Sequence, residues 1–287
     1  MKDTILFGDC RETLSQIDEK VRMCVTSPPY YGLRNYGDES NQIGQEDTPE
    51  EYIQNLVDIF RSVRNCLSDD GTLWVNIGDS YYNYRPGKGQ ALVQQSVSKS
   101  KQDLPEKCAR RGNKLEGLKE KDLIGIPWML AFALRADGWY LRQDIIWHKS
   151  NPMPESVRDR CTKSHEYMFL LSKSQNYYFD VDVIKEPTRR KRSVWNVSTK
   201  PYKGSHFAVF PPELITPCIL ASSEENDIIL DPFIGSGTTA MVAKELGRYY
   251  IGCELHEDYG NLIQERMGVS VDKVVHNGLT SAFNDVE

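Results

Sequence analysis

Residues 227–239 read Asp-Ile-Ile-Leu-Asp-Pro-Phe-Ile-Gly-Ser-Gly-Thr-Thr, and this stretch decides the fold class. The apolar run Ile228–Leu230 predicts a strand, the two glycines predict a tight turn, and Thr239–Leu246 is a predicted helix. A second predicted strand follows at Tyr249–Cys253. Such a strand–helix–strand unit is typical of one half of a doubly wound α/β fold. By itself the Gly-x-Gly turn is weak support, because tight turns often need glycine for backbone reasons alone.

The acidic residues of this unit indicate the kind of cofactor that it would bind. Asp231 lies at the carboxyl end of the first strand, where it would repel the pyrophosphate of a dinucleotide. S-adenosylmethionine carries a sulfonium and an ammonium group instead of phosphate, so a carboxylate beside the turn favours it. Glu254 directly follows the second strand and has the spacing expected of an acid that binds ribose. The alternative for Glu254 is an acid that merely ends an edge strand.

Apolar periodicity elsewhere predicts strands alternating with helices, which indicates a mostly parallel sheet with helices on both faces. The other predicted strands are Thr4–Phe7, Met23–Thr26, Thr72–Ile77, Tyr140–Trp147 and Tyr167–Leu171, and the other predicted helices are Pro49–Leu67, Ile126–Arg135 and Glu213–Ala221. Three segments rich in glycine, proline, serine and charge interrupt this alternation: Tyr84–Leu123, Asn151–Ser164 and Glu186–Gly204. Insertions of this length are usually functional loops or disorder.

The composition is that of a globular protein with one large core: 287 residues, of which 39% are hydrophobic and 26% charged. No run of about 18 apolar residues is present, so we expect no membrane span. The chain begins on a predicted strand without a signal-peptide pattern, and its seven cysteines show no CxxC spacing. We therefore expect reduced thiols in a cytoplasmic protein, and no metal site, because the five histidines form no cluster either.

The net charge of -6 alone argues against a nucleic-acid partner, but basic residues gather in two segments. Lys185–Lys203 holds seven lysines or arginines and one acid, and Lys99–Lys121 holds eight basic residues and four acids. Either segment is a candidate surface for nucleic-acid phosphates. A solvated charged face is an equally good interpretation of each segment alone.

A second motif comes early, where the predicted strand Met23–Thr26 runs into Ser27-Pro28-Pro29-Tyr30. Two consecutive prolines fix φ, remove two donors and force a rigid extended turn. The Ser27 hydroxyl and the Pro28 carbonyl can then point the same way as paired acceptors, with the Tyr30 ring beside them. This arrangement suits a planar group that bears an NH2, because the ring can stack on its face. Taken alone, the tetrapeptide is more often a proline turn or a polyproline segment.

Together the two motifs resemble those of the β-group of DNA amino-methyltransferases, in which a proline motif precedes the glycine motif. Further matching pieces are Gly8-Asp9-Cys10, Asn76–Tyr81, Trp147–Pro154, His165-Glu166-Tyr167 and His206–Leu214, so that the resemblance extends to Arg266. It implies a fold of class α/β, a Rossmann-like methyltransferase. The expected fold has a mostly parallel seven-stranded sheet with helices on both faces, a circularly permuted motif order and inserted target-recognition loops. The implied catalytic domain is formed by 1–84, 123–185 and 205–266, with inserted DNA-recognition segments at 85–122 and 186–204 and a C-terminal tail at 267–287.

The resemblance also implies roles for individual residues. Those expected to act on the base are Ser27, Pro28, Pro29 and Tyr30. Those expected to bind the cofactor, S-adenosylmethionine, are Asp9, Phe207, Phe210, Asp231, Phe233, Gly235, Ser236, Gly237, Thr238 and Glu254. Those expected to contact DNA are Arg110, Arg111, Lys114, Arg189, Arg190, Lys191 and Arg192. The expected partner is double-stranded DNA, with a cognate restriction endonuclease as a further candidate, and the protein would act as a monomer or homodimer in the cytoplasm of a bacterial or phage-infected cell.

The implied reaction is methylation of an exocyclic amine on a base flipped out of the duplex. The Ser27 hydroxyl and the Pro28 carbonyl would accept the amine hydrogens, and no covalent enzyme intermediate is needed. Family members with Ser in the proline motif more often methylate cytosine N4, and those with Asp adenine N6. Cytosine N4 is therefore favoured and adenine N6 stays open. Two further alternatives are a methyltransferase of RNA or protein amides, in which the glycine motif usually comes first, and a non-catalytic DNA-binding relative, which would have no reason to retain the paired acceptors.

Overall fold

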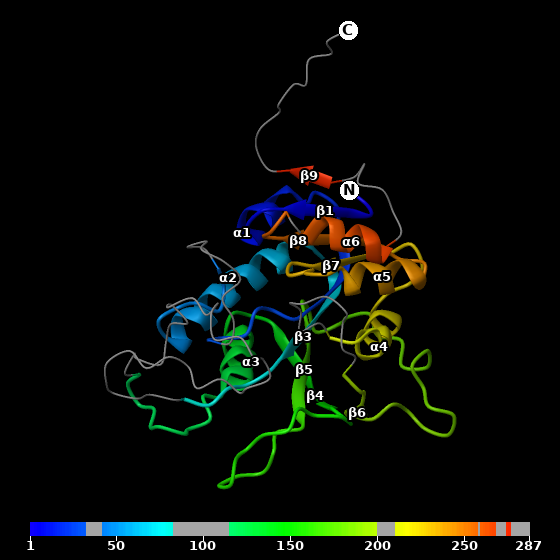
Figure 1. The fold of residues 1–287 in the computed structure, drawn as a ribbon. Helices are drawn as coiled ribbons and strands as arrows, with labels where there is room; N and C mark the ends of the chain where they lie inside the picture. The colour runs from blue at the N-terminus through cyan, green and yellow to red at the C-terminus, as the bar shows by residue number, and fades with distance from the viewer. Residues whose placement is uncertain (33–41, 83–114, 200–209, 258, 268–273, 277–287) are drawn as a thin grey trace.

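The computed structural model describes residues 1–32, 42–82, 115–199, 210–257, 259–267 and 274–276, which contain one sheet of nine strands (Figure 1). The strands are β1 (Thr4–Phe7), β2 (Val21–Thr26), β3 (Leu67–Ile77), β4 (Tyr140–His148), β5 (His165–Ser172), β6 (Val194–Asn196), β7 (Ile228–Asp231), β8 (Tyr249–Glu254) and β9 (Val274–His276). Their order across the sheet is β6-β4-β5-β3-β2-β7-β8-β1-β9. β5 is antiparallel to both of its neighbours, and the other neighbouring pairs are parallel. The predicted α/β class with a mostly parallel sheet is confirmed.

The helices of the described residues are α1 (Cys10–Thr13), α2 (Pro49–Cys66), α3 (Ile126–Ala136), α4 (Pro212–Ser222), α5 (Thr238–Glu245) and α6 (Tyr259–Met267), with a 3-10 turn at Leu14–Gln16. α2 begins as the sequence predicts, because the Thr48 hydroxyl accepts a hydrogen bond from the Glu51 amide at 3.2 Å. Within the part of the chain that the structure describes, no helix is both long and apolar enough to cross a membrane, and no three His, Cys, Asp or Glu residues gather as a metal site requires.

The expected number of seven strands is wrong. All seven predicted strands are present, but β6 and β9 add one further strand at each edge of the sheet. Each of these two is only three residues long, which is too short for apolar alternation to be recognised in the sequence. The short helices α1 and α6 were not predicted either.

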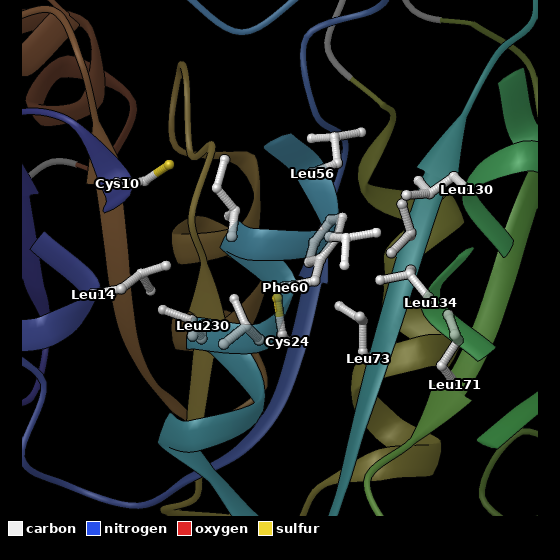
Figure 2. Packing of buried hydrophobic residues seen from close by; sticks show 14 of the residues in the cluster. Cys10, Leu14, Cys24, Leu56, Phe60, Leu73, Leu130, Leu134, Leu171 and Leu230 are labelled. Atoms are coloured by element: carbon white, nitrogen blue, oxygen red, sulfur yellow. The ribbon is translucent and has the colours of Figure 1, made fainter. Parts of the chain in front are cut away.

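Alternate residues of each strand point to opposite faces of the sheet, and each face is covered by its own helices. On one face, Cys24 of β2 and Leu73 of β3 pack with Leu56 and Phe60 of α2 and with Leu134 of α3 (Figure 2). On the other face, strands β2, β3 and β7 pack with α4 and α5 through Met23, Val25, Trp74, Leu214, Ile215, Ile229, Ala240 and Val242. The centre of the sheet is therefore buried on both sides, which leaves the strand ends as the place for chemistry.

β2 and β7 lie side by side at a topological switch point. From β2 the chain passes through α2 to β3 on one side, and from β7 it passes through α5 to β8 on the other. Crossovers that leave in opposite directions open a crevice at the carboxyl ends of the two strands, which is where open α/β sheets bind ligands. The proline motif follows β2 and the glycine loop follows β7, so both lie at this crevice.

Candidate active site

A buried hydrogen bond joins the two motifs. The Thr26 hydroxyl donates to Asp231 Oδ1 at 2.6 Å. Asp231 also accepts from the Thr239 hydroxyl at 2.6 Å and from the Phe233 amide at 3.0 Å. Only 1% of Asp231 is exposed, and burial raises the pKa of its carboxyl to about 6, although these three hydrogen bonds oppose the rise. One carboxylate thus holds the start of the proline turn and the glycine loop together.

The glycine loop, residues 232–237, needs glycine at two positions. Gly235 has φ +52 and Gly237 has φ +81, in the left-handed region that side chains disfavour. A Cβ on Gly237 would lie 3.2 Å from Ile263 of α6, whereas the nearest atom to a Cβ on Gly235 would be 4.0 Å away. The Gly235 amide donates to Glu254 Oε2 at 3.0 Å. The loop is therefore anchored to the end of β8 and is open above Gly235.

Glu254 ends a strand in the interior of the sheet, since β8 lies between β7 and β1. The alternative of an acid on an edge strand is therefore wrong. Glu254 is 7% exposed, its Oε1 accepts from the His256 amide at 3.0 Å, and burial raises its pKa to about 7. No described cation pairs with Glu254 or with Asp231. Two buried carboxylates without a counter-charge favour a cationic ligand.

Two other predicted cofactor residues lie within the glycine loop or directly after it. Ser236 is buried, and its hydroxyl accepts a hydrogen bond from Arg266 Nη1 at 2.8 Å. The hydroxyl of Thr238 is buried and has no hydrogen-bond partner among the described residues. Phe233 is partly buried against the core on the α2 face. Sequence reasoning missed Arg266, because no local pattern marks a single arginine near the end of a helix.

The remaining predicted cofactor residues are placed differently. Asp9 follows β1, whose Phe7 lies in register with Glu254, so it reaches the same edge of the sheet. Burial alone would raise the pKa of Asp9, but hydrogen bonds and the charge of Arg11 outweigh this and lower it. Phe210 is buried in the core on the α4 face, just before α4, and Phe207 lies outside the described residues.

The residues at this edge fit S-adenosylmethionine. Its sulfonium and ammonium groups would face the uncompensated carboxylates Asp231 and Glu254, and its ribose hydroxyls can donate to Glu254. The buried Thr238 hydroxyl without a partner among the described residues offers a further polar contact. The two acids are less suited to the phosphates of a dinucleotide.

The proline turn is anchored from α2. The hydroxyl of Tyr52, whose side chain is fully buried, donates to the Pro29 carbonyl at 2.8 Å. Ser27 is half-buried and Pro28 is buried. Of the described residues, none donates a backbone hydrogen bond to the Pro28 carbonyl. The carbonyl is therefore available as an acceptor, as the sequence predicts.

Tyr30 is held by residues from two other strands. Its hydroxyl lies 2.7 Å from Glu166 Oε2 on β5 and 3.3 Å from Asn76 Oδ1 on β3. Burial raises the pKa of Tyr30 well above its usual value, and the carboxylate of Glu166 raises it further. Gly78 makes room for the ring, because a Cβ there would lie only 2.7 Å from Tyr30 Cε2.

Sequence reasoning did not assign roles to the residues around Tyr30. Asn76, Gly78, Lys149 and Glu166 were all present in pieces that match the family, and this was the available signal. Their contact with Tyr30 could not be predicted, because it depends on the pairing of β3 with β5 and on the position of β2 next to β3.

The predicted DNA-contacting residues divide into two groups. Arg110, Arg111 and Lys114 lie outside the described residues. Arg189 pairs with Glu186 at 2.6 Å, Lys191 lies over the Trp195 ring, and Arg190 and Arg192 lie at or near the surface beside them. These four residues precede the edge strand β6, whereas the proline turn lies at the carboxyl ends of the central strands. They therefore form a basic flank and not a part of the crevice itself.

Comparison with known proteins adds sequence and fold relationships. Residues 21–265 match the family model N6_N4_Mtase, described as DNA methylase. The type II methyltransferase M.SmaI of Serratia marcescens is 52% identical over 271 residues, which cover 92% of this chain and 90% of that protein. M.Cfr9I of Citrobacter freundii is 48% identical over 270 residues, with 92% and 87% covered.

Two solved structures show the same Rossmann-like methyltransferase fold. The PvuII DNA methyltransferase (cytosine-N4-specific) has a TM-score of 0.70 at 18% identity and is matched over 95% of this chain and 88% of that one. A DNA modification methylase of Thermus thermophilus, TTHA0409, solved in complex with S-adenosyl-L-methionine, has a TM-score of 0.64 at 23% identity, with 96% and 99% covered.

Proposed function

Because this chain belongs to the N6_N4_Mtase family of DNA methylases, we propose that it methylates the N4 amine of cytosine at a specific site in duplex DNA. It is a DNA amino-methyltransferase that uses S-adenosylmethionine, and the relatives that it matches over most of their length are type II methyltransferases. The observation that carries the proposal is the 2.6 Å hydrogen bond between Thr26 and Asp231. It brings the proposed amine acceptors and the proposed cofactor loop to one crevice.

The proposed chemistry begins with activation of the amine. An exocyclic amine is a poor nucleophile because its lone pair is delocalised into the ring. The Ser27 hydroxyl and the Pro28 carbonyl would accept its two hydrogens and so localise the lone pair on nitrogen. Tyr30 would stack on the flipped base, a contact worth about 1–3 kcal/mol, and would offset part of the cost of flipping.

S-adenosylmethionine supplies an electrophilic methyl group on a positively charged sulfur. The residues proposed to hold it are Glu254, Asp231 and the open backbone at Gly235. Thiol chemistry is not required, and burial raises the pKa of Cys24 and Cys253, which keeps these two thiols protonated. The catalytic gain would therefore come from positioning and from preorganised acceptors.

Cofactor affinity is expected to rise with pH between pH 5 and 7.5. Burial raises the pKa of Glu254 to about 7 and that of Asp231 to about 6, so both carboxyls are largely protonated at pH 5 and ionised at pH 7.5. The ionised forms attract the cationic cofactor, and we expect an increase of roughly tenfold in affinity. Isothermal titration calorimetry across this range would measure it.

The variant Glu254→Gln should flatten this pH dependence, because the glutamine does not ionise. Glu225→Gln serves as the matched control, since Glu225 is exposed and lies outside the crevice. An unchanged pH dependence in Glu254→Gln would contradict the assignment of Glu254 to the cofactor site.

Gly78→Ala is expected to slow methyl transfer by about 100-fold. The added Cβ would lie 2.7 Å from Tyr30 Cε2, so the ring must move from its place beside the acceptors. Single-turnover rates with labelled cofactor would show the effect, with Ser80→Ala as the nearby control that adds no atom. A variant Gly78→Ala with the wild-type rate would mean that the position of the Tyr30 ring does not matter.

DNA recognition is proposed to involve the inserted segments 85–122 and 186–204. Arg190 and Arg192 lie at or near the surface beside β6, and their charges suit phosphate contacts. Neutralising such contacts weakens binding to all sequences alike and reduces its salt dependence. A net charge of -6 is compatible with this role, because DNA binding depends on the local charge of the contacting surface.

The choice of cytosine is supported by the motif Thr26-Ser27-Pro28-Pro29-Tyr30, in which a serine stands where adenine-type relatives more often have an aspartate. Adenine N6 is the second candidate. The test is to express the protein, digest the cellular DNA to nucleosides and separate them by mass spectrometry. N4-methyldeoxycytidine supports the proposal, whereas N6-methyldeoxyadenosine overturns the choice of base.

A further inference from the structure

Three side chains from different segments converge on the hydroxyl of Tyr30. Glu166 Oε2 lies 2.7 Å from it and Asn76 Oδ1 lies 3.3 Å from it. Asn76 is itself fixed, because its Nδ2 donates to the Tyr167 carbonyl at 3.1 Å and lies 3.3 Å from Glu166 Oε2. The other oxygen of Glu166 accepts from the ammonium of Lys149, the residue that directly follows β4. The hydroxyl of Tyr30 thus ends a chain of polar contacts that crosses three strands.

The ion pair within this chain is largely buried. The Lys149 side chain is 22% exposed and that of Glu166 is 14% exposed. Desolvating two charges costs roughly as much as their attraction returns, so such a pair is weak support for a purely stabilising role. Lys149 is also oriented from the other side, because its ammonium lies 4.7 Å from the centre of the Trp147 ring. The pair therefore specifies a geometry more than it contributes stability.

Tyr30 is the residue whose geometry this network specifies. Gly78 limits the ring on one side, since even a methyl group there would collide with it. Glu166 and Asn76 hold the hydroxyl end. A phenol ring that is fixed at both its edge and its hydroxyl is preorganised, and a stacked base would inherit its position.

We propose that Glu166 and Lys149 are positioning residues for methyl transfer, which act through the hydroxyl of Tyr30 to set the place of the flipped base beside Ser27. The inference rests on the proposed function, because it needs a base stacked on Tyr30. Glu166 fixes the hydroxyl, and Lys149 fixes Glu166. Neither side chain needs to touch the base or the cofactor for this role.

A double-mutant cycle between Tyr30→Phe and Glu166→Ala tests the proposal. We expect Tyr30→Phe to lower the single-turnover rate by about tenfold and Glu166→Ala by about 10- to 100-fold. If Glu166 acts through the hydroxyl, the double variant should be no more than about twofold slower than Glu166→Ala. The affinities for S-adenosylmethionine and for duplex DNA should stay within about twofold of wild type, so that the loss appears in the rate of transfer and not in binding.

The conservative variant Glu166→Gln provides a second measurement. The glutamine retains an oxygen that can accept from Tyr30 but loses the attraction to Lys149, so its rate should lie between those of wild type and Glu166→Ala. Should Glu166→Ala fail to fold, the same cycle is run with Glu166→Gln. Asp227→Asn is the matched control, because it breaks a comparably buried ion pair with Arg22 that lies outside the crevice, and it should retain the wild-type rate.

The outcomes separate this inference from the proposed function. If the two losses simply multiply in the double variant, or if Glu166→Ala transfers methyl groups at the wild-type rate, Glu166 does not act through Tyr30 and the inference is overturned. If the wild-type protein methylates adenine and not cytosine, the proposed base is wrong, whereas the cycle still reads out the positioning of Tyr30.

Discussion

Replacing Ser27 by alanine is expected to slow methyl transfer by about 100- to 1,000-fold, which is the usual cost of removing one preorganised polar group from a reacting centre. Ser27 follows the strand that Thr26 fixes to Asp231, so its hydroxyl sits at the crevice with a rigid proline turn behind it. Without the hydroxyl, only the Pro28 carbonyl remains to accept an amine hydrogen. The lone pair of the amine would then stay delocalised into the base.

The measurement is a single-turnover assay with labelled S-adenosylmethionine and duplex DNA. Cofactor affinity, measured by calorimetry, should be nearly unchanged, because Ser27 belongs to the proline turn and not to the glycine loop. Ser15→Ala is the control, since Ser15 is exposed and its hydroxyl donates to the nearby carbonyl of Glu12, away from the crevice. A Ser27→Ala variant with full activity would show that the amine is activated by other groups.

Replacing Asp231 by alanine is expected to affect both stability and activity. The carboxylate accepts hydrogen bonds from Thr26, Thr239 and the Phe233 amide, and the variant would leave all three donors without this partner in a buried place. Each unsatisfied buried donor costs about 1–3 kcal/mol, so we expect a loss of about 3 kcal/mol or more in the free energy of unfolding. Methyl transfer should fall by at least about 100-fold, because the proline turn loses its link to the glycine loop.

Thermal unfolding and single-turnover rates would check this prediction. Asp231→Asn retains one acceptor oxygen and should lie between wild type and Asp231→Ala in both measurements. Asp58→Ala is the matched control, because Asp58 is a half-exposed acid on the outer side of α2 and its loss should change stability by less than about 0.5 kcal/mol. A stable and active Asp231→Ala variant would mean that the two motifs do not depend on their shared carboxylate.

Most strands and helices could be predicted because their signals are local. The apolar runs of β1, β2, β4, β5, β7 and β8 and the capped start of α2 at Thr48 are visible within a few residues. β6 and β9 could not be predicted, because a three-residue strand depends on the neighbour that it pairs with. The order of the strands, and hence the crevice between β2 and β7, also required the assembled sheet.

The candidate site shows the same division. Ser27, Tyr30, Asp231 and Glu254 were identified because each belongs to a short motif with its own chemistry. The role given to Asp231 changes in the structure, where its oxygens are engaged by Thr26, Thr239 and Phe233, so that it acts through its buried charge and through the geometry that it holds.

The sequence by itself determined the α/β class, the two motifs and the type of reaction, because a strand, a glycine turn and a proline turn are each specified by neighbouring residues. Only the tertiary structure decided which of these groups meet. Thr26 reaches Asp231 across 205 positions of the chain, and Tyr30 reaches Glu166 across 136. Contacts over such separations depend on the register of the strands between them, and register is a property of the whole sheet.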